Sequence, residues 1–298
     1  MNQHPDATTA EDHGGDVVDL TDSSERREVA DLTSQGMSLS IVMPAHNEEA
    51  TIDRAVRRVL AASVRCPFEL IVVDDGSTDE TAARLERIRD SRVRVVNQKV
   101  NLGKGAAVRT GAAAARGTHI LVFDADLEYD PDDIDILVGE VIEHDMTVVY
   151  GTRLFGQNTV YGSFRYAMGN RATTFAANCL FDSYISDLHT CLKLLPTDLF
   201  RSLHLTENGF GLDTEITAEL LRRGFRPFEV PVRYVGRSRA EGKKITWRDG
   251  VECLSILAKV RMRRHRTSTV ERSCGNRFVV TAGPVGNVDR DVAVSVLA

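Results

Sequence analysis

The sequence predicts an α/β protein with a single main domain, built on a mostly parallel, twisted sheet flanked by helices. Short apolar segments alternate with helix-like segments through the first half of the chain. Such alternation is typical of parallel strands joined by right-handed helical crossovers. The chain has 298 residues, of which 42% are hydrophobic and 27% charged, and this suits a globular protein with an ample core.

Four strands are expected in the first half of the chain. Each is a short apolar run that is followed at once by polar turn residues and then by a helical segment. The expected strands cover residues 38–44, 70–73 and 93–98, together with the run 120–123 that ends at Asp124. The Gly-Ser-Thr turn at 76–78 is expected to cap a helix, and 101–117 is expected to be a small-residue helix with a Gly-rich entry.

The second half is less regular. We expect a strand over 148–156 that runs into Arg153, helices over 160–181, 211–224 and 251–266, and an extended segment over 225–236. Between the last two lies a basic, Gly-containing loop, residues 237–250, which is suited to close over phosphates. His189 is interpreted as a structural histidine because no second histidine follows four residues later.

The two ends of the chain differ from this central part. Residues 1–37 hold nine acidic and two basic residues, a charge of −7, so the rest of the −6 chain carries +1. This acidic segment is poor in aromatic residues and is predicted to be disordered. The ordered domain is expected to span 38–266, and no order is assigned to the tail, residues 267–298.

Composition excludes several classes of protein. A charge of +1 outside the acidic tail does not indicate a nucleic-acid-binding protein. Five scattered cysteines without metal-binding spacing fit reduced thiols in a cytoplasmic protein. We find no signal-peptide pattern and no run near the roughly 18 apolar residues of a membrane span. Contact with a membrane is therefore expected to be peripheral at most, at its inner face.

The chemistry is expected at the carboxyl ends of the strands. The run ending at Asp124 is followed by Asp126, Glu128 and Asp130, and two earlier strands also end near acids, Glu48 and Asp74-Asp75. Helix caps and solvated turns explain each group alone, but not three acidic strand ends in one sheet. Together they favour a site for sugar or base hydroxyls and a hard cation, Mg²⁺ or Mn²⁺.

Two familiar phosphate loops are absent from the sequence. Residues 101–105, NLGKG, lack the spacing and the hydroxyl residue of a P-loop. The first strand is not followed by a GxGxxG fingerprint, so a nicotinamide cofactor is not expected. A bound phosphate would therefore have to be held by a metal and by lysine or arginine side chains.

The motifs of this chain, taken in order, resemble those of a known protein family. The chain contains PAHNEEATI, VVDDGSTDET, NLGKGAAVRTG, DADLEYDP, YGTR, SDLHTCLK, DTEITAEL and EVPVRYVGRSRAEGKKITWRDG in that order. Between about residues 38 and 266 it resembles the family 2 glycosyltransferases, and within them the dolichyl- or polyprenyl-phosphate mannose and glucose synthases. The resemblance implies a GT-A fold, a nucleotide-sugar donor and inversion at the anomeric carbon.

The same resemblance implies roles for individual residues. The DxD motif corresponds to Asp124, Ala125 and Asp126. Asp124 would contact the donor and assist in metal binding, and Asp126 would bind the metal directly. Glu128, two residues after the motif, would assist Asp126 in binding the metal. Arg153 would contact phosphate, Arg165 or Arg171 would help with the acceptor phosphate, and the chain has His46 where relatives often have tyrosine. The base and ribose of the donor would be held by Pro44, His46, Glu48, Val73 and Asp75. Lys104 would also bind the donor, and Arg237 and the catalytic residue Lys243 would contact its phosphates.

The sequence is compatible with three functions. The first is metal-dependent transfer of a hexose from a nucleotide sugar, of the GDP-mannose or UDP-glucose type, to polyprenyl phosphate. This acceptor is already anionic, so it needs no general base. The second is transfer to a soluble hydroxyl acceptor, which would need a base, for which we nominate Asp187. The third is an inactive sugar-nucleotide-binding protein. The sequence leaves the oligomeric state open.

Overall fold

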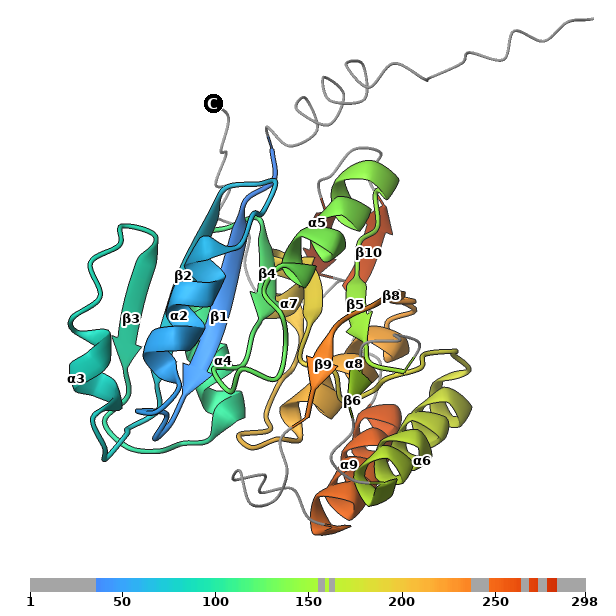
Figure 1. Ribbon diagram of the computed structural model, residues 1–298. Helices are drawn as coiled ribbons and strands as arrows, with labels where there is room; N and C mark the ends of the chain where they lie inside the picture. Colours follow the sequence, from blue (N-terminus) through green and yellow to red (C-terminus); the bar gives the residue numbers. More distant parts are fainter. Residues whose placement is uncertain are drawn as a thin grey trace, which may run out of the picture.

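A computed structural model describes residues 36–154, 159–160, 164–236, 247–263, 268–272 and 278–282. The seven-stranded sheet has the order β3-β2-β1-β4-β7-β5-β8 and is built from β1 (Leu39–Ala45), β2 (Phe68–Asp74), β3 (Val93–Asn97), β4 (His119–Val122), β5 (Val149–Thr152), β7 (Lys193–Pro196) and β8 (Phe228–Pro231). Figure 1 shows the strands twisting across the molecule between layers of helices.

All of these strands run in one direction except β7. It pairs antiparallel with β4 on one side and with β5 on the other, whereas β1 pairs parallel with both β2 and β4. The predicted fold class, a mostly parallel sheet flanked by helices, is thus confirmed. The reversed strand was not predicted, because its direction depends on its partners in the sheet rather than on its own apolar sequence.

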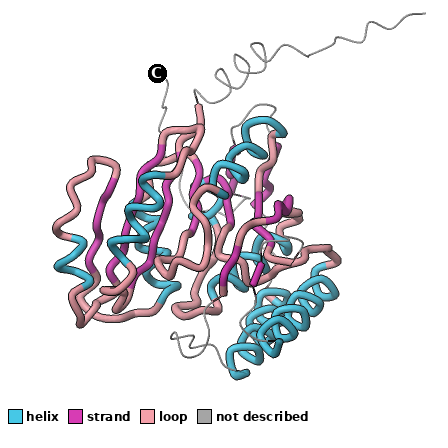
Figure 2. The backbone as a smooth tube through the Cα atoms, in the orientation of Figure 1, coloured by secondary structure: helices cyan, strands magenta, loops and turns pink. Residues whose placement is uncertain are grey.

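Helices cover both faces of the sheet, as Figure 2 also shows. The helices α2 (Ile52–Ala61) and α5 (Asp133–His144) pack on one face, and α4 (Lys104–Ala114), α7 (Thr197–Ser202) and α8 (Leu212–Arg222) pack on the other. Side chains of β1 alternate between these layers: Ile41 and Met43 belong to the first core, and Val42 belongs to the second. This alternation is the period of two that a strand buried on both faces requires.

Close contact between α4 and the sheet depends on small residues. A Cβ atom at Gly111 would overlap a methyl group of Val42 in β1. Gly103, which precedes the helix, has φ +97 and abuts the carbonyl group of Asn208. A larger residue at either position would push the helix or its entry loop away from the sheet.

A third core lies beyond α8. The helices α6 (Phe164–Phe181) and α9 (Trp247–Met262) pack against α8 through Phe181, Leu221 and Leu257. As Figure 1 shows, α6 and α9 lie side by side at the carboxyl end of the strands. The predicted helices at 160–181 and 211–224 are found close to their expected bounds. The last helix begins at Trp247 and ends at Met262, four residues earlier than the predicted 251–266.

Several smaller elements lie outside the main sheet and its large helices. They are α3 (Thr81–Leu85), the two-stranded parallel pair β6 (Thr159–Val160) and β9 (Tyr234–Val235), and the hairpin β10 (Ser268–Arg272) and β11 (Phe278–Ala282). The hairpin lies in the tail to which no order was assigned. Within the described part of the chain, the helices lack the combined length and apolar character needed to cross a membrane. The cysteines there, Cys66, Cys179, Cys191 and Cys253, form no disulfides.

Candidate active site

The predicted polar strand ends meet at the carboxyl edge of the sheet. Ala45 of β1 lies beside Asp74 of β2, which in turn lies beside Asn97 of β3. On the other side of β1, the backbone N–H of Phe123 donates to the carbonyl of Val42 at 2.9 Å, so Asp124 leaves the sheet next to β1. Parallel pairing therefore brings four segments of the sequence to one edge.

Asp75 organises the donor side of this edge. Its buried carboxylate accepts hydrogen bonds from the backbone N–H groups of Leu102 and Gly103, both at 2.8 Å. Its carbonyl oxygen accepts a hydrogen bond from Nδ1 of His46 at 2.9 Å. Asp75 thus ties the predicted base-binding residue His46 to the loop that leads into Lys104.

The other predicted base- and ribose-binding residues differ in exposure. Pro44 and Glu48 are partly buried, and the Glu48 carboxylate accepts a hydrogen bond from the Thr51 hydroxyl at 2.6 Å. Val73 pairs with Pro44 across the strands, but its side chain is fully buried in the core beneath α4. A ligand at this edge would meet Pro44 and Glu48 rather than the Val73 side chain.

Lys104 joins the DAD motif to α8. Its Nζ lies 2.9 Å from Oδ2 of Asp124 and 3.2 Å from Oδ2 of Asp213, and Nζ of Lys193 lies 3.7 Å from the other oxygen of Asp213. Burial alone would lower the pKa of Lys104, but the two carboxylates raise it well above its ordinary value. The result is a row of alternating charges that links β4, α4, α8 and β7.

The three predicted metal ligands do not converge. Asp124 faces Lys104, the Glu128 carboxylate accepts a hydrogen bond from the Tyr234 hydroxyl, and Asp126 accepts one from the Glu128 backbone N–H at 3.1 Å. Over the described ranges, no three Asp, Glu, His or Cys side chains are grouped as a metal site. Long-range partners hold Asp124 and Glu128 in this arrangement. The assignment of Asp124, Asp126 and Glu128 to a metal stays a prediction.

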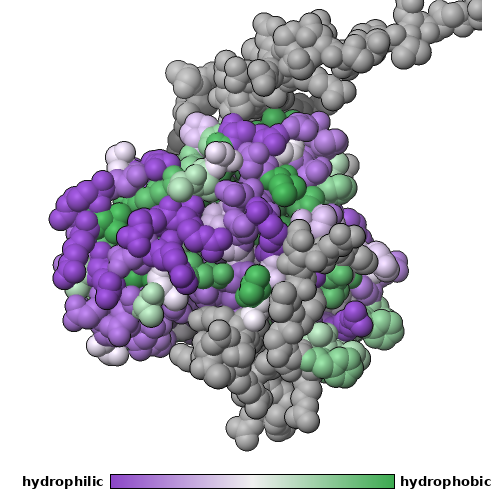
Figure 3. Space-filling view, viewed as in Figure 1, coloured by the Kyte–Doolittle hydropathy of each residue, from purple (hydrophilic) through white to green (hydrophobic). Residues whose placement is uncertain are grey.

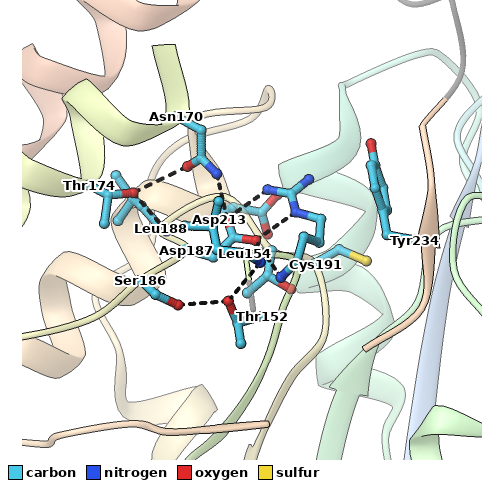
Figure 4. Close-up of polar contacts among 12 residues, drawn as sticks. Thr152, Leu154, Asn170, Thr174, Ser186, Asp187, Leu188, Cys191, Asp213 and Tyr234 are labelled. Atoms are coloured by element: carbon cyan, nitrogen blue, oxygen red, sulfur yellow. Dashed lines mark hydrogen bonds and ion pairs between the residues drawn. The ribbon is translucent and has the colours of Figure 1, made fainter. Parts of the chain in front are cut away.

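Arg153 and Asp187 form the second charged unit. The guanidinium Nε and Nη2 atoms lie 2.6 Å and 2.7 Å from the two carboxylate oxygens, and Nδ2 of Asn170 on α6 donates to Oδ1 at 2.8 Å. Figure 4 shows Asn170 pointing at Asp187 from its helix. Burial alone would raise the pKa of Asp187, but Arg153 and these hydrogen bonds lower it to about 2.

The loop carrying Asp187 is held from below by β8. The Glu229 carboxylate accepts hydrogen bonds from the Ser186 backbone N–H at 2.8 Å and from its hydroxyl at 2.9 Å, and Ser186 also bonds to Thr152 at 2.7 Å. His189 contacts the Thr173 hydroxyl at 2.8 Å, and burial lowers its pKa to about 4. These contacts agree with the structural role predicted for His189.

The contacts described above do not include several of the predicted phosphate-binding residues. Arg237 and Lys243 lie outside the described residues. The backbone of Arg165 belongs to α6 and its side chain is outside the description, while Arg171 is exposed on the same helix.

Sequence reasoning missed three residues of this region. They are Asp213 in the helix expected over 211–224, Tyr234 in the extended segment 225–236, and Lys193. The guanidinium carbon of Arg153 lies 5.0 Å from the centre of the Tyr234 ring. Asp213 lies 109 positions from Lys104, and local spacing carries no signal for contacts over such distances.

The charges of the site favour a cation. Among the described residues, the carboxylates of Asp124, Asp126, Glu128, Asp187 and Asp213 outnumber the three cations, those of Lys104, Arg153 and Lys193, and Asp75 adds a further buried carboxylate at the same edge. An anionic diphosphate would be repelled unless further positive charge entered with it. Magnesium-type ions are commonly held by one or two carboxylates together with substrate phosphates. Asp126 fits that arrangement without a three-carboxylate cluster.

Comparisons with known proteins agree with this geometry. The sequence model of Glycosyl transferase family 2 matches residues 40–203. Glycosyltransferase AglD of Haloferax volcanii is 30% identical over 217 residues, which are 70% of this chain and 35% of the relative. Dodecaprenyl-phosphate galacturonate synthase of Rhizobium johnstonii is 39% identical over 176 residues, 57% of this chain and 51% of the relative. The chain thus spans about half or less of the length of these relatives.

A solved structure confirms the GT-A fold. Glucosyl-3-phosphoglycerate synthase from Mycobacterium tuberculosis, in complex with UDP, superposes with a TM-score of 0.59 at 21% identity and covers 81% of this chain and 87% of its own. The family match extends over more than half of the chain, from β1 to the end of α7, and includes the DAD motif, Arg153 and Asp187. This chain belongs to glycosyl transferase family 2.

Proposed function

We propose that the chain carries the catalytic domain of a metal-dependent inverting glycosyltransferase, which moves a hexose from a nucleotide sugar to polyprenyl phosphate. Two relatives support the acceptor class by their names, the dodecaprenyl-phosphate galacturonate synthase and a dolichyl-phosphate beta-glucosyltransferase of Dictyostelium discoideum that is 32% identical over 129 residues. The observation that carries the proposal is that α6 has two different faces. One face contacts the active site, and the opposite face is apolar and exposed.

The inner face of α6 bears on the active site. Asn170 donates to Asp187, and the hydroxyl of Thr174 donates to Oδ1 of Asn170 at 3.2 Å and accepts from the Leu188 backbone N–H at 3.1 Å. The helix therefore positions the Arg153–Asp187 pair directly.

The outer face of the same helix is apolar and exposed. Phe164 is 79% exposed, Phe175 is 69% exposed, and Met168 lies between them at the spacing of one helix face. The neighbouring α9 adds Val251, Leu254 and Met262, which are also exposed. In Figure 3, hydrophobic residues gather at the lower right of the molecule, the region of α6 in Figure 1. We call the exposed residues Phe164, Met168, Phe175, Val251, Leu254 and Met262 the α6–α9 surface.

Basic side chains accompany the α6–α9 surface. Arg171 is exposed on α6, and Lys259 and Arg261 are exposed in the last turns of α9. Apolar faces bordered by arginine and lysine are typical of helices that lie in the headgroup region of a membrane. Peripheral contact of this kind, at the inner face of a membrane, would bring a lipid-linked phosphate to the carboxyl end of the strands.

The proposed mechanism relies on alignment and on stabilisation of the leaving group. The acceptor phosphate attacks the anomeric carbon while the bond to the nucleoside diphosphate breaks, and negative charge accumulates on the departing diphosphate. Arg153 and Lys104 face that charge, while Asp187 and Asp213 hold the two cations in place. A divalent ion, Mn²⁺ or Mg²⁺ at Asp126, would act as a Lewis acid on the diphosphate.

The contacts of Asp187 disfavour the hydroxyl-acceptor alternative that nominates it as the base. Both of its oxygens accept hydrogen bonds from Arg153, and a carboxyl group with a pKa of about 2 is a weak proton acceptor near neutral pH. We therefore propose that Asp187 acts by positioning Arg153, a role that suits an acceptor needing no deprotonation.

A transfer assay tests the proposal. The protein is incubated with undecaprenyl phosphate and GDP-mannose, UDP-glucose or UDP-GlcNAc, with Mn²⁺, with Mg²⁺ or with EDTA, and sugar in the organic phase is measured. We expect metal-dependent transfer from one donor. Donor binding without transfer or hydrolysis under any condition would instead support the inactive binding protein. Donor hydrolysis with no sugar in the organic phase would refute the lipid acceptor.

A further inference from the structure

Tyr234 links two parts of the active site that lie far apart in the sequence. Its ring is buried in β9, with 2% of the residue exposed. The hydroxyl donates a hydrogen bond to Oε2 of Glu128, which follows the DAD motif. The face of the ring supports Arg153, whose guanidinium carbon lies 5.0 Å from the ring centre. One side chain thus contacts both the acidic loop and the phosphate-binding arginine.

The ring is held in place independently of its hydroxyl. The backbone N–H of Val235 donates to the carbonyl of Glu128 at 2.9 Å, and Tyr129 and Tyr234 form an antiparallel bridge. The rings of these two tyrosines also pack together, with centres 5.1 Å apart. Removing the hydroxyl alone should therefore leave the ring, and its contact with Arg153, where they are.

The hydroxyl acts on the acidic loop through Glu128. That residue is 8% exposed, and its backbone N–H donates to Oδ1 of Asp126 at 3.1 Å. Leu127 between them has φ +64, a conformation that favours glycine and that the surrounding contacts must maintain. A charge-assisted hydrogen bond to the Glu128 carboxylate is suited to maintain it.

We propose that Tyr234 is a positioning residue with two separable roles. Its hydroxyl fixes Glu128 and so the orientation of Asp126 toward a divalent cation, and its ring fixes the guanidinium of Arg153 toward the diphosphate. The inference rests on the proposed function, since it assigns Tyr234 to the same site. The two contacts lie on different atoms of one side chain, so substitutions can remove one without the other.

Binding of Mn²⁺ and of nucleoside diphosphate tests the two roles without turnover. Free Mn²⁺ is measured by electron paramagnetic resonance in the presence of GDP or UDP, and metal-free nucleotide binding is measured by calorimetry. Tyr234→Phe should weaken Mn²⁺ binding roughly 10- to 100-fold, the usual effect of one lost hydrogen bond to a charged group, and leave metal-free nucleotide binding unchanged. Tyr234→Leu should weaken both.

Two further variants sharpen this test. Tyr150→Phe removes another buried hydroxyl, bonded to Thr217 at 3.1 Å, and should leave Mn²⁺ binding as in the wild type. Glu128→Gln leaves an amide oxygen that accepts a weaker, neutral hydrogen bond from the Tyr234 hydroxyl, so it should weaken Mn²⁺ binding. Adding Tyr234→Phe to it should cost less than Tyr234→Phe costs alone, because both changes act on one contact.

The outcomes separate the inference from the function on which it rests. If the wild type binds Mn²⁺ with nucleotide and Tyr234→Phe binds both equally well, or if the Glu128→Gln and Tyr234→Phe effects simply add, the positioning role is wrong. If the wild type binds neither nucleotide with Mn²⁺, the proposed function fails and the inference fails with it. Thermal unfolding of each variant shows whether a loss of Mn²⁺ binding arises from unfolding. If the Tyr234 variants are unfolded, Mn²⁺ binding by Glu128→Gln tests the positioning role, and unchanged binding by that variant would contradict it.

Discussion

Arg153 and Asp187 form a buried bidentate ion pair, with Nε 2.6 Å from Oδ2 and Nη2 2.7 Å from Oδ1. The Asp187 side chain is 0% exposed and that of Arg153 is 12% exposed. Such a pair costs desolvation free energy, and breaking it leaves one buried charge without its partner. The pair therefore fixes where Arg153 points, and both the stability and the activity of the domain should depend on it.

The first prediction concerns stability and pH. Asp187→Asn should destabilise the domain by roughly 3 kcal/mol near pH 7, because Arg153 stays buried and charged. The pKa of Asp187 is lowered to about 2 in the folded state, so its contribution is complete above its ordinary unfolded value and declines as the pH falls toward 2.

Urea unfolding of wild type and variant between pH 2 and 7 measures this contribution. The difference in unfolding free energy should be constant above pH about 4.5 and should shrink below it. As a control, Asp53→Asn weakens the partly exposed pair with Arg84 and should cost less than about 1 kcal/mol. A difference that grew toward acid would contradict the assignment.

The second prediction concerns the rate. If Asp187 positions Arg153 and no general base is needed, the rate of sugar transfer should be nearly independent of pH above the second pKa of the acceptor phosphate. The pH profile of kcat/KM, measured for wild type and Asp187→Asn, checks this. A limb with a carboxylate-like pKa that disappears in the variant would restore Asp187 as a base and favour a hydroxyl acceptor.

The third prediction concerns Asp126. Asp126→Ala should abolish turnover, a loss of at least about a hundredfold, because the diphosphate would lose its metal-mediated stabilisation. The fold should survive, since the residue is only partly buried. Turnover with Mn²⁺ and a circular dichroism spectrum are the measurements, and Asp198→Ala, at an 84% exposed side chain, is the control. Full activity in a folded Asp126→Ala protein would remove the metal assignment.

The fourth prediction concerns Lys243, which lies in the basic loop outside the described residues. Lys243→Ala should raise the donor KM or lower kcat without unfolding the protein, because a cation that contacts the diphosphate would be lost. Steady-state kinetics with varied donor provide the check. Arg89→Ala, at an exposed arginine before β3, should behave as wild type. An unchanged kcat/KM for Lys243→Ala would exclude the loop lysine from the mechanism.

The fifth prediction concerns the α6–α9 surface. Replacing both Phe164 and Phe175 by serine should lower binding to vesicles containing phosphatidylglycerol by more than about tenfold, because each buried phenylalanine contributes roughly 1.5–3 kcal/mol. Both residues are largely exposed, so the fold should persist. Co-sedimentation measures the binding, with Ile136→Ser on α5 as an exposed apolar control. Equal binding of both variants and the wild type would show that another surface meets the lipid.

The sequence by itself determined the architecture to a large extent. Apolar runs with polar ends predicted β1, β2, β3 and β4, because the alternation of strand and helix is a local property of the chain. The same reasoning located the strand ends that meet at the site, since parallel pairing brings carboxyl ends to one edge. It also identified the DAD motif and, through the resemblance, Arg153.

Only the tertiary structure decided which charges meet. Asp124 pairs with Lys104, 20 positions away along the chain, and Glu128 accepts a hydrogen bond from Tyr234, 106 positions away. Asp187, nominated as a base, is bound by Arg153 instead. The direction of β7 was likewise set by its neighbours. The local sequence indicates periodicity and turn chemistry, whereas the partner of a buried charge depends on packing between distant segments. Electrostatic interactions are stronger in the low dielectric of the interior, so the choice of partner there has a large effect on stability.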